Sequence, residues 1–583
     1  MSKPRGRVTE EAGNGEGRGR AFFNEPDTAG LMHRAFTRSL GFDKADMDRP
    51  LIGILNTYSE MNNCHAHFPE LVEAVKRGVW QAGGFPLEFP TISLGEIYLT
   101  PTSMLWRNLA AMDAEEMIRG NPMDGLVALC GCDKTTPAAL MGVASADVPA
   151  ILVSGGPMLN GHWRGQTLGA CTDCRRLTTE YRAGNLNDEE YLEVEENLVR
   201  SRGHCMVMGT ASTMNSLTEA MGISLPGNGA IPAADSRRIL LAENAGRRIV
   251  GLAAEGVRPS QILTRKALEN AVTLLCALGG STNAVVHLPA LAGRLGIDLP
   301  IDLFDQISRS TPLLANIRPS GAYQMEDLFY AGGIPAILRE LLPLLHSDAK
   351  TVTGKTLAES VAGSEIVDAD VIRSYDSPLK TEGGLAILRG NLAPSGAVIK
   401  HAAASSELMH HRGRALVFSD IADLQARIDD PSLDVEPGDV MVLQNAGPVG
   451  GPGMPEVGNL PIPRKLLRRG VRDMVRISDA RMSGTAFGTI VLHVAPEAAV
   501  GGPLALVRSG DEIELDVTGR GLNLIVSEEE LSRRRAAWRP PEPGYKRGYG
   551  KLFLDHVLQA PQGLDFDFLL GRDPVETMAQ PKF

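Results

Sequence analysis

The sequence lacks any apolar run approaching the roughly 20 residues that a membrane-spanning helix needs. Its first twenty residues lack the apolar core of a secretory signal, and they are rich in glycine and charge, so we expect residues 1–20 to be disordered. Basic runs are also short and the net charge is −12, which argues against nucleic acid or an anionic membrane as a main partner. These absences predict a cytoplasmic protein.

Cysteine is scarce, with seven residues among 583, which is too few for a disulfide framework and favours free thiols or metal ligands. The one CxxC pair, Cys171 and Cys174, has no second pair or histidines at motif spacing, so we do not expect a zinc site. Cys276 lies in an apolar helical run and is interpreted as a core residue. Ser-His-Asp and GxSxG patterns are absent as well, which argues against an acyl-transfer serine.

What is present is the composition of an ordinary globular protein, with 43% hydrophobic and 22% charged residues, at a length that predicts more than one domain. Between about 346 and 384 the chain turns polar. We expect an α/β domain with one or more parallel sheets over residues 21–383. Many short strands divided by glycine and proline predict a β-rich, barrel-like domain over residues 384–583.

Three short apolar runs in the first domain, at 51–55, 126–129 and 149–154, predict buried strands, and apolar residues at helical spacing follow the first of them over 68–79. In such α/β units, ligands bind beyond the carboxyl ends of the strands. Cys64 lies in one of the resulting strand-to-helix loops.

Cys132 occupies a second such loop, directly followed by Asp133 and Lys134. A thiol, a carboxylate and a lysine are thus placed together where α/β proteins carry out chemistry. The alternative is a buried cysteine beside a surface Asp–Lys pair, and this stretch by itself leaves both open. Cys205 enters a third loop, before a helix for which Ser212 or Thr213 is the expected N-cap.

Further polar constellations lie in small-residue loops. Glu456 stands among glycines and prolines at 451–459, and hydroxyls, a carboxylate and a guanidinium share residues 476–485. Turn chemistry and a surface ion pair are the alternative interpretations. The loop at 279–284 could approach an anionic ligand, but without further support an ordinary helix start is the preferred interpretation.

These segments, taken in order, resemble a known family. They resemble motifs of the dihydroxy-acid/sugar-acid dehydratases, and the segments that carry this resemblance are Gly-Cys-Asp-Lys-Thr-Thr-Pro, Gly-Thr-Ala-Ser-Thr-Met, Gly-Gly-Ser-Thr-Asn-Ala, Met-Pro-Glu-Val-Gly-Asn and Ser-Asp-Ala-Arg-Met-Ser-Gly-Thr. That family includes dihydroxy-acid dehydratase and phosphogluconate dehydratase. The resemblance runs from about residue 51 to the C-terminal region.

The resemblance implies an iron–sulfur hydro-lyase whose subunits form dimers or tetramers and whose site lies between the two domains. It implies a cluster, [2Fe–2S] in preference to [4Fe–4S], and a Mg²⁺ site in which the lysine is carbamylated. Three histidines near the cysteines, His65, His67 and His204, are interpreted as supporting or packing residues. Carried over position by position, the implied roles are Cys64, Cys132 and Cys205 as cluster ligands, Glu96, Asp133, Lys134 and Glu456 as magnesium ligands, Ser483 as general base and Thr485 as substrate contact.

The segment Ser-Leu-Gly-Glu-Ile-Tyr at 93–98 is similar to pentonate dehydratases acting on arabinonate or xylonate. The implied reaction converts a 2,3-dihydroxycarboxylate into a 2-keto-3-deoxy acid. Dehydration of 2,3-dihydroxyisovalerate in branched-chain amino acid biosynthesis stays open. Two other classes also remain, an iron–sulfur sensor, which would need neither magnesium site nor base, and an enolase-type Mg²⁺ lyase, whose activity would survive loss of the cysteines.

Overall fold

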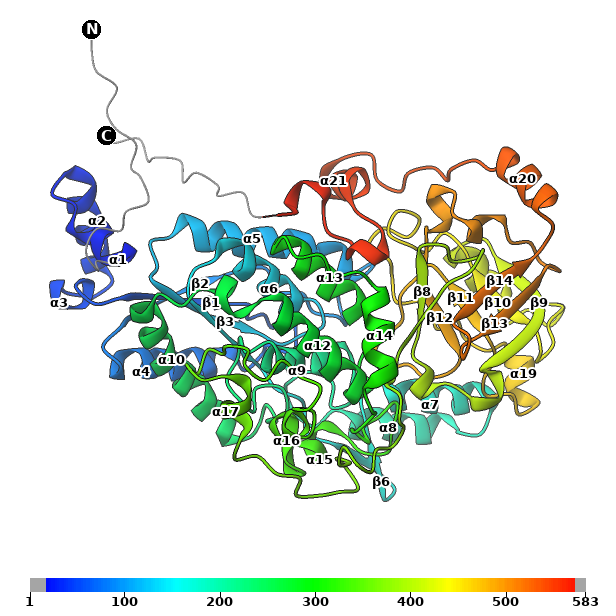
Figure 1. The fold of residues 1–583 in the computed structure, drawn as a ribbon, viewed down its shortest axis with the longest axis horizontal. Helices are drawn as coiled ribbons and strands as arrows, with labels where there is room; N and C mark the ends of the chain where they lie inside the picture. Colours follow the sequence, from blue (N-terminus) through cyan, green and yellow to red (C-terminus); the bar gives the residue numbers. More distant parts are fainter. Residues whose placement is uncertain (1–16, 572–583) are drawn as a thin grey trace, which may run out of the picture.

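A parallel four-stranded sheet forms the centre of the first half of the chain in the computed structural model, which describes residues 17–571 (Figure 1). The strand order is β2-β1-β3-β4. Apart from the outer part of β2, these strands are buried on both faces, as expected for a parallel sheet covered by helices. The bounds are β1 Leu51–Asn56, β2 Phe85–Pro90, β3 Gly125–Cys130 and β4 Ala150–Ser154.

Helices cover both faces of this sheet. In Figure 1, α5 and α6 lie above it, and α4 and α10 lie below it. Helices α9 and α13 pack against α6, and α12 and α14 to α17 extend the apolar core beyond them. Among residues 17–571, no helix is both long enough and apolar enough to span a membrane. The bounds are α1 Arg18–Asn24, α2 Thr28–Ser39, α3 Lys44–Met47, α4 Phe68–Gln81, α5 Arg107–Gly120, α6 Thr135–Ala146, α9 Thr210–Ala220, α10 Ser236–Glu255, α11 Pro259–Ile262, α12 Arg265–Leu278, α13 Ala284–Arg294, α14 Asp302–Ser310, α15 Met325–Tyr330, α16 Gly333–Glu340 and α17 Leu357–Val361.

A mixed eight-stranded sheet organises the second half, in the order β14-β13-β9-β10-β11-β12-β8-β7. The four strands β9 to β12 run parallel to one another, and antiparallel strands flank this group on both sides. The two edges approach each other where the Arg389 amide donates to the Arg520 carbonyl at 2.8 Å, so the sheet is nearly closed. The bounds are β7 Ala386–Leu388, β8 Gly396–Ile399, β9 His410–Phe418, β10 Val440–Leu443, β11 Arg476–Ser478, β12 Ile490–Ala495, β13 Glu512–Asp516 and β14 Gly521–Ile525, with helices α18 Ile421–Arg427, α19 Arg464–Arg468, α20 Glu528–Ala537 and α21 Gly548–His556.

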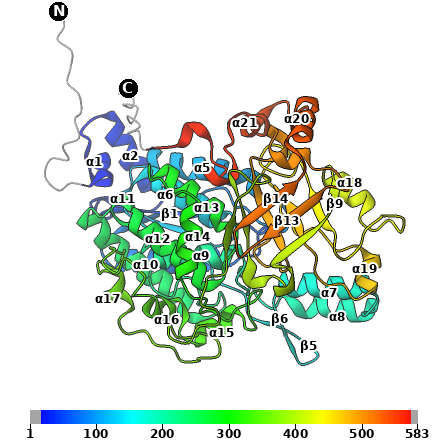
Figure 2. The ribbon, with the colours of Figure 1, turned by 45° about the vertical axis from the view of Figure 1, so that its right-hand side comes forward.

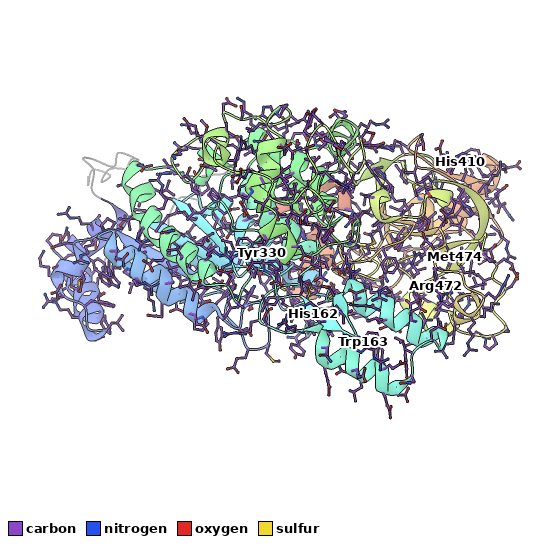
Figure 3. All side chains as sticks on the ribbon, turned by 90° about the horizontal axis from the view of Figure 1, so that it is seen from below. His162, Trp163, Tyr330, His410, Arg472 and Met474 are labelled. Atoms are coloured by element: carbon purple, nitrogen blue, oxygen red, sulfur yellow. The ribbon has the colours of Figure 1, made fainter. Side chains whose placement is uncertain are left out.

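Two helices from the first half lie beside the eight-stranded sheet. They follow a hairpin that pairs β5 (Gly161–Trp163) with β6 (Gln166–Leu168), and their bounds are α7 Thr172–Ala183 and α8 Asp188–Leu198. Figure 2 shows α7 and α8 below β9, and Figure 3 shows Arg472 beside them. Arg472 pairs at 3.2 Å with Glu180, in the last turn of α7, and α7 also packs against α19. Helix α7 is thereby held at the boundary between the two halves.

The end of the described chain packs back onto the first half. Arg107 of α5 donates to the carbonyls of Gly563 and Leu564 at 2.8 and 3.0 Å. Arg294 of α13, which is 1% exposed, pairs with Asp565 at 2.5 Å and with Glu115 at 3.1 Å. Residues from opposite ends of the sequence therefore share one buried charge network.

The α/β class predicted from the sequence is confirmed, as are the three strands of the first half and the helix over 68–79. The predicted N-cap at Ser212 or Thr213 is wrong, because α9 begins at Thr210 and is preceded by Gly209. The sequence analysis does not predict strands β2, β8 and β14, since each contains glycine or proline and none is a continuous apolar run as clear as β1 or β3. Of the segment 1–20, residues 1–16 lie outside the described residues, and Arg18 begins α1.

Replacement of Arg294 by leucine should strongly destabilise the fold, because Asp565 would remain buried without a partner. Breaking a buried pair in this way costs about 3–5 kcal/mol. The matched control is Arg309→Leu, which removes a half-exposed pair with Asp305 and should cost less than about 1 kcal/mol. Urea and thermal unfolding measure both variants, and equal midpoints for the two would contradict the proposed importance of the Arg294 network.

Candidate active site

Three carboxylates and one lysine meet between the two halves of the molecule. Single oxygen atoms of Glu96, Asp133 and Glu456 all lie within 4.8 Å of one another. The Lys134 ammonium lies 3.3 Å from Glu96, 3.3 Å from Glu456 and 3.6 Å from Asp133. The sequence separates Glu456 from Lys134 by more than 300 residues, so the fold alone brings these groups together.

Local structure explains how each group reaches this point. Asp133 and Lys134 follow β3 at the carboxyl edge of the parallel sheet, immediately before α6. Glu96 lies in the irregular segment after β2 at the same edge, and its carboxylate accepts a hydrogen bond from Ser103. Glu456 comes from the loop between β10 and α19 of the second half. The edge predicted to bind ligands is therefore the edge that faces the second sheet.

Burial and charge act on these groups in opposite directions. Removal from water raises the pKa of Glu96 to about 7, in spite of the nearby lysine. For Glu456, burial is outweighed by Lys134 and Arg481, which lower its pKa to about 2. Burial lowers the pKa of Lys134, but Glu96 and Glu456 more than offset this and raise it. The carboxylates thus create a place where positive charge is stabilised.

Two residues of this site were not assigned from the sequence. Arg481, fully buried, donates to Glu456 at 2.8 Å. Asn283 donates to Glu456 at 2.9 Å and to the Met482 carbonyl at 3.2 Å. The loop at 279–284, interpreted as an ordinary helix start, therefore supplies a ligand-site residue. The sequence signal for Asn283 was an asparagine within a small-residue loop. Spacing alone could not connect this asparagine to Glu456.

The three thiols expected from the sequence converge beside the carboxylates. Cys64 follows β1, Cys132 follows β3, and the loop of Cys205 runs beside the end of β4, where the Met158 amide donates to the His204 carbonyl at 2.8 Å. Contact with the Cys132 thiol is the main cause that raises the pKa of Cys64 well above its usual value, followed by burial. The charges of Cys132 and Cys205 raise the pKa of Cys64 further.

His65 supports this thiol group through the backbone. Its Nδ1 lies 2.7 Å from the Thr57 carbonyl, so this nitrogen carries the proton. Its Nε2 then accepts a hydrogen bond from the Cys132 amide at 3.0 Å. Burial lowers the pKa of His65 to about 3, which keeps the ring neutral. His65 is a positioning residue for the Cys132 loop, as the interpretation of the histidines as supporting residues anticipated.

A fourth thiol lies close to the group. The Cys171 and Cys205 sulfur atoms are 3.3 Å apart, and the Cys171 amide donates to the Cys174 sulfur at 3.2 Å. Cys171 opens α7 with φ +70°, and the next residue, Thr172, donates to the Thr485 carbonyl at 2.9 Å. The spacing of the CxxC pair does not connect it to Cys205, because α7 reaches this place only through the hairpin that precedes it.

Ser483 and Thr485 occupy a loop after β11 that is pressed against the first half. The Ser483 and Thr485 hydroxyls are 2.8 Å apart, and the Thr485 amide lies 3.4 Å from the Ser483 hydroxyl oxygen. A Cβ atom at Gly484 would lie 2.6 Å from the Ser281 hydroxyl, so only glycine permits this approach. Ser483 is 7% exposed, which leaves it buried but not sealed from a ligand.

The donor sets fit the groups that the family resemblance implies. Three carboxylates that share one point suit a hard divalent cation, which prefers oxygen ligands. Cys64, Cys132 and Cys205 come from separate loops, and the thiols of Cys64 and Cys132 are in contact, so this donor set suits an iron–sulfur cluster. Among residues 17–571, Glu96, Asp133 and Glu456 are the one group of three carboxylates, thiols or imidazoles whose ligand atoms all lie within 4.8 Å of one another.

Comparisons with known proteins agree with this architecture. Residues 49–360 match the model of the dihydroxy-acid/6-phosphogluconate dehydratase N-terminal domain, and residues 370–564 match the C-terminal domain. The chain is 54% identical over 94% of its length to L-arabonate dehydratase of Azospirillum brasilense, covering 96% of that protein. It is 52% identical over 93% to L-arabinonate dehydratase of Rhizobium leguminosarum bv. trifolii, covering 94% of that protein.

A third relative, 6-deoxy-6-sulfo-D-gluconate dehydratase of Pseudomonas putida, is 50% identical over 94% of the chain and 96% of that protein. Dihydroxy-acid dehydratases are more distant, at 40–43% identity. The fold and the site define a dehydratase, that is, a hydro-lyase. The chain belongs to the dihydroxy-acid/6-phosphogluconate dehydratase family.

Replacement of Cys64, Cys132 or Cys205 by serine should each abolish iron binding, because a cluster held by three thiolates loses a ligand. Iron and acid-labile sulfide content of the purified protein measure this directly. The control is Cys276→Ala in the core of α12, which should retain the full iron content. Cys171→Ser and Cys174→Ser should also retain iron. Loss of iron in Cys171→Ser together with retention in Cys205→Ser would contradict the ligand assignment.

Proposed function

We propose that this protein dehydrates sugar acids, namely 2,3-dihydroxycarboxylates such as pentonates and hexonates, to 2-keto-3-deoxy acids. The observation that carries this proposal is the convergence of the three-carboxylate group, the three thiols and the Ser483 loop between the two sheets. The names of the relatives at 50–54% identity support sugar acids over 2,3-dihydroxyisovalerate. Dehydration of that branched-chain precursor is the second candidate, favoured by the relatives at 40–43%.

Glu96, Asp133 and Glu456 would hold Mg²⁺, and a carbamylated Lys134 would add a further oxygen ligand. When bound, the ion would supply positive charge that neutralises the substrate carboxylate. A free Lys134 ammonium already balances Glu96 and Glu456 at 3.3 Å, so ion and ammonium compete for the same carboxylates. Carbamylation removes that competition, because it turns a cation into an oxygen ligand.

Cys64, Cys132 and Cys205 would hold the cluster, [2Fe–2S] in preference to [4Fe–4S]. Three protein ligands leave one iron open, and the cluster when bound would supply a Lewis acid for the departing 3-hydroxyl. His65 would keep the Cys132 loop in place, through the hydrogen bond from the Cys132 amide. This requirement for sulfur separates the proposal from an enolase-type lyase.

Ser483 would remove the proton from C2 of the substrate, and Thr485 would contact the substrate. An ordinary serine is far too weak a base, so its alkoxide must be stabilised by its surroundings. The Thr485 hydroxyl and amide at 2.8 and 3.4 Å are two donors suited to this role. The iron–sulfur sensor interpretation offers no use for such a base.

We also propose a cytoplasmic homodimer or homotetramer, built from an α/β domain over residues 21–383 and a barrel-like domain over residues 384–583. The gap between the two family matches, from 361 to 369, supports a boundary in this region. The proposed partner is a small-molecule hydroxy acid, with no nucleic acid and no membrane.

The decisive experiment combines iron, sulfide and magnesium analysis with a screen of aldonates and 2,3-dihydroxyisovalerate, scored for the 2-keto acid product. Sugar-acid dehydration predicts turnover of at least one pentonate or hexonate at a higher kcat/KM than 2,3-dihydroxyisovalerate. Turnover of 2,3-dihydroxyisovalerate alone would favour the second candidate. Absence of any product from protein with full iron content would overturn both and favour a sensor.

Glu456→Gln should weaken the dependence of activity on Mg²⁺ and lower kcat by about 10–100-fold, because the site loses one charged oxygen ligand. Iron content should stay unchanged, since Glu456 contacts none of the three thiols. Titration of chelator-treated enzyme with Mg²⁺ or Mn²⁺ measures the effect. Full activity of the wild type after exhaustive chelation, with iron retained, would remove the magnesium role.

Ser483→Ala should lose turnover while iron content, Mg²⁺ affinity and substrate binding stay close to wild type. The loss should fall in kcat, as expected for an interaction made in the transition state. Exchange of the C2 hydrogen with deuterated solvent, if detected in the wild type, should vanish in the variant. A nearly normal kcat with a slightly lowered Tm would instead show that Ser483 only stabilises its loop, by about 1 kcal/mol.

A further inference from the structure

Lys400 lies at the end of β8, directly behind the Ser483 loop. Its side chain is 1% exposed, and its ammonium donates to the Gly484 carbonyl at 3.3 Å. Lys400 belongs to none of the motifs that identified the site. It reaches the loop because β8 pairs with β12, the strand that follows the Ser483 loop in the chain.

The charge of Lys400 has no compensating group in the described structure. Among residues 17–571, no carboxylate lies within 4 Å of its ammonium, and the Gly484 carbonyl is its one hydrogen-bond acceptor. A buried ammonium without an ion-pair partner is costly, and burial accordingly lowers the pKa of Lys400 to about 7. In its protonated form Lys400 is therefore a buried cation beside the Ser483 loop, and a negative charge that arises on this loop would stabilise it.

The contact leads to Ser483 through a single peptide group. The Gly484 carbonyl that accepts from Lys400 and the Thr485 amide belong to the same peptide unit. That amide points to the Ser483 hydroxyl oxygen at 3.4 Å. When a peptide carbonyl accepts a hydrogen bond from a cation, the peptide group becomes more polarised and its N–H becomes a stronger donor. Linked hydrogen bonds reinforce one another in this way. The path is therefore Lys400 ammonium, Gly484 carbonyl, Thr485 amide and Ser483 oxygen.

Neighbouring backbone contacts fix the positions of the groups in this path. The segment after Lys400 runs along the loop, with the Gly488 amide donating to the Ala403 carbonyl at 2.8 Å. On the other side, Thr172 donates to the Thr485 carbonyl at 2.9 Å. Both contacts follow the Gly484–Thr485 peptide in the chain, and before it the Met482 carbonyl accepts from Asn283 at 3.2 Å. The peptide is thus held from both sides, and the direction of the Thr485 amide is fixed with it.

We propose that Lys400 is a positioning residue which, through the Gly484–Thr485 peptide, stabilises Ser483 in its deprotonated form. The inference rests on the proposed role of Ser483 as base. The proton that leaves C2 passes to the Ser483 oxygen, and its electron pair stays on the substrate. Lys400 exchanges no proton in this step and supplies positive charge through the peptide.

Lys400→Met, which keeps the side-chain length without the charge, tests the proposal. We expect kcat and C2 hydrogen exchange to fall together by about 100-fold, the usual scale for losing one electrostatic contact to a developing anion. KM and iron content should stay within about threefold of wild type. The Tm should be unchanged or higher, because an unpaired buried charge is removed. Lys465→Met is the matched control, since Lys465 also donates to a backbone carbonyl, that of Leu433.

A second variant separates charge from contact. Lys400→Gln retains a donor for the Gly484 carbonyl without positive charge, and should lose kcat about as strongly as Lys400→Met. Near-normal kcat in Lys400→Gln, or kcat within threefold of wild type in Lys400→Met, would overturn the proposal. So would a loss confined to KM and Tm, which indicates a packing role.

Ser483→Ala, assayed in parallel, separates this inference from the proposed function. If Ser483→Ala keeps normal turnover, the assignment of the base is wrong, whatever Lys400 does. If Ser483→Ala is inactive and Lys400→Met is normal, the base assignment stands and the role of Lys400 alone fails.

Discussion

The concentration of negative charge at Glu96, Asp133 and Glu456 is the constraint on which the rest of the structure depends. Carboxylates this close cannot all stay ionised without positive charge between or beside them. Lys134 and Arg481 supply that charge from opposite halves of the molecule, at 3.3 and 2.8 Å from Glu456. Each half therefore buries charge here that it could not bury alone. The ion pairs of the site help to hold the two halves together.

The Ser483 loop is likewise held by contacts that both halves of the molecule share. Gly484 brings the Ser483 loop against Ser281, while Asn283 links Glu456 to the Met482 carbonyl. Each contact crosses between the halves. The geometry around Ser483 is consequently set by backbone groups and small side chains, which lose little conformational entropy when they are fixed.

Much of the fold could be predicted from the sequence, because the strands of the first sheet are continuous apolar runs and its ligand-binding edge follows from their direction. Cys64, Cys132 and Asp133 were placed correctly at that edge for this reason. Asn283, Arg481 and Lys400 carry no comparable local signal, since each becomes significant only through a partner that lies 173, 25 and 84 residues away, respectively. The cap of α9 was misplaced because Gly209 begins that helix without a side chain to mark it.

The buried network around Arg294 has a consequence for how the chain is made. Asp565 and the carbonyl of Leu564, which complete the pairing of Arg294 and Arg107, come 271 and 457 residues after these arginines and therefore leave the ribosome later. Until they emerge, Arg107 of α5 and Arg294 of α13 lie in an apolar setting without these partners. The first half can form its sheet and helices during synthesis, since domains fold as their residues emerge. It reaches its final packing only after residues 564 and 565 have been translated.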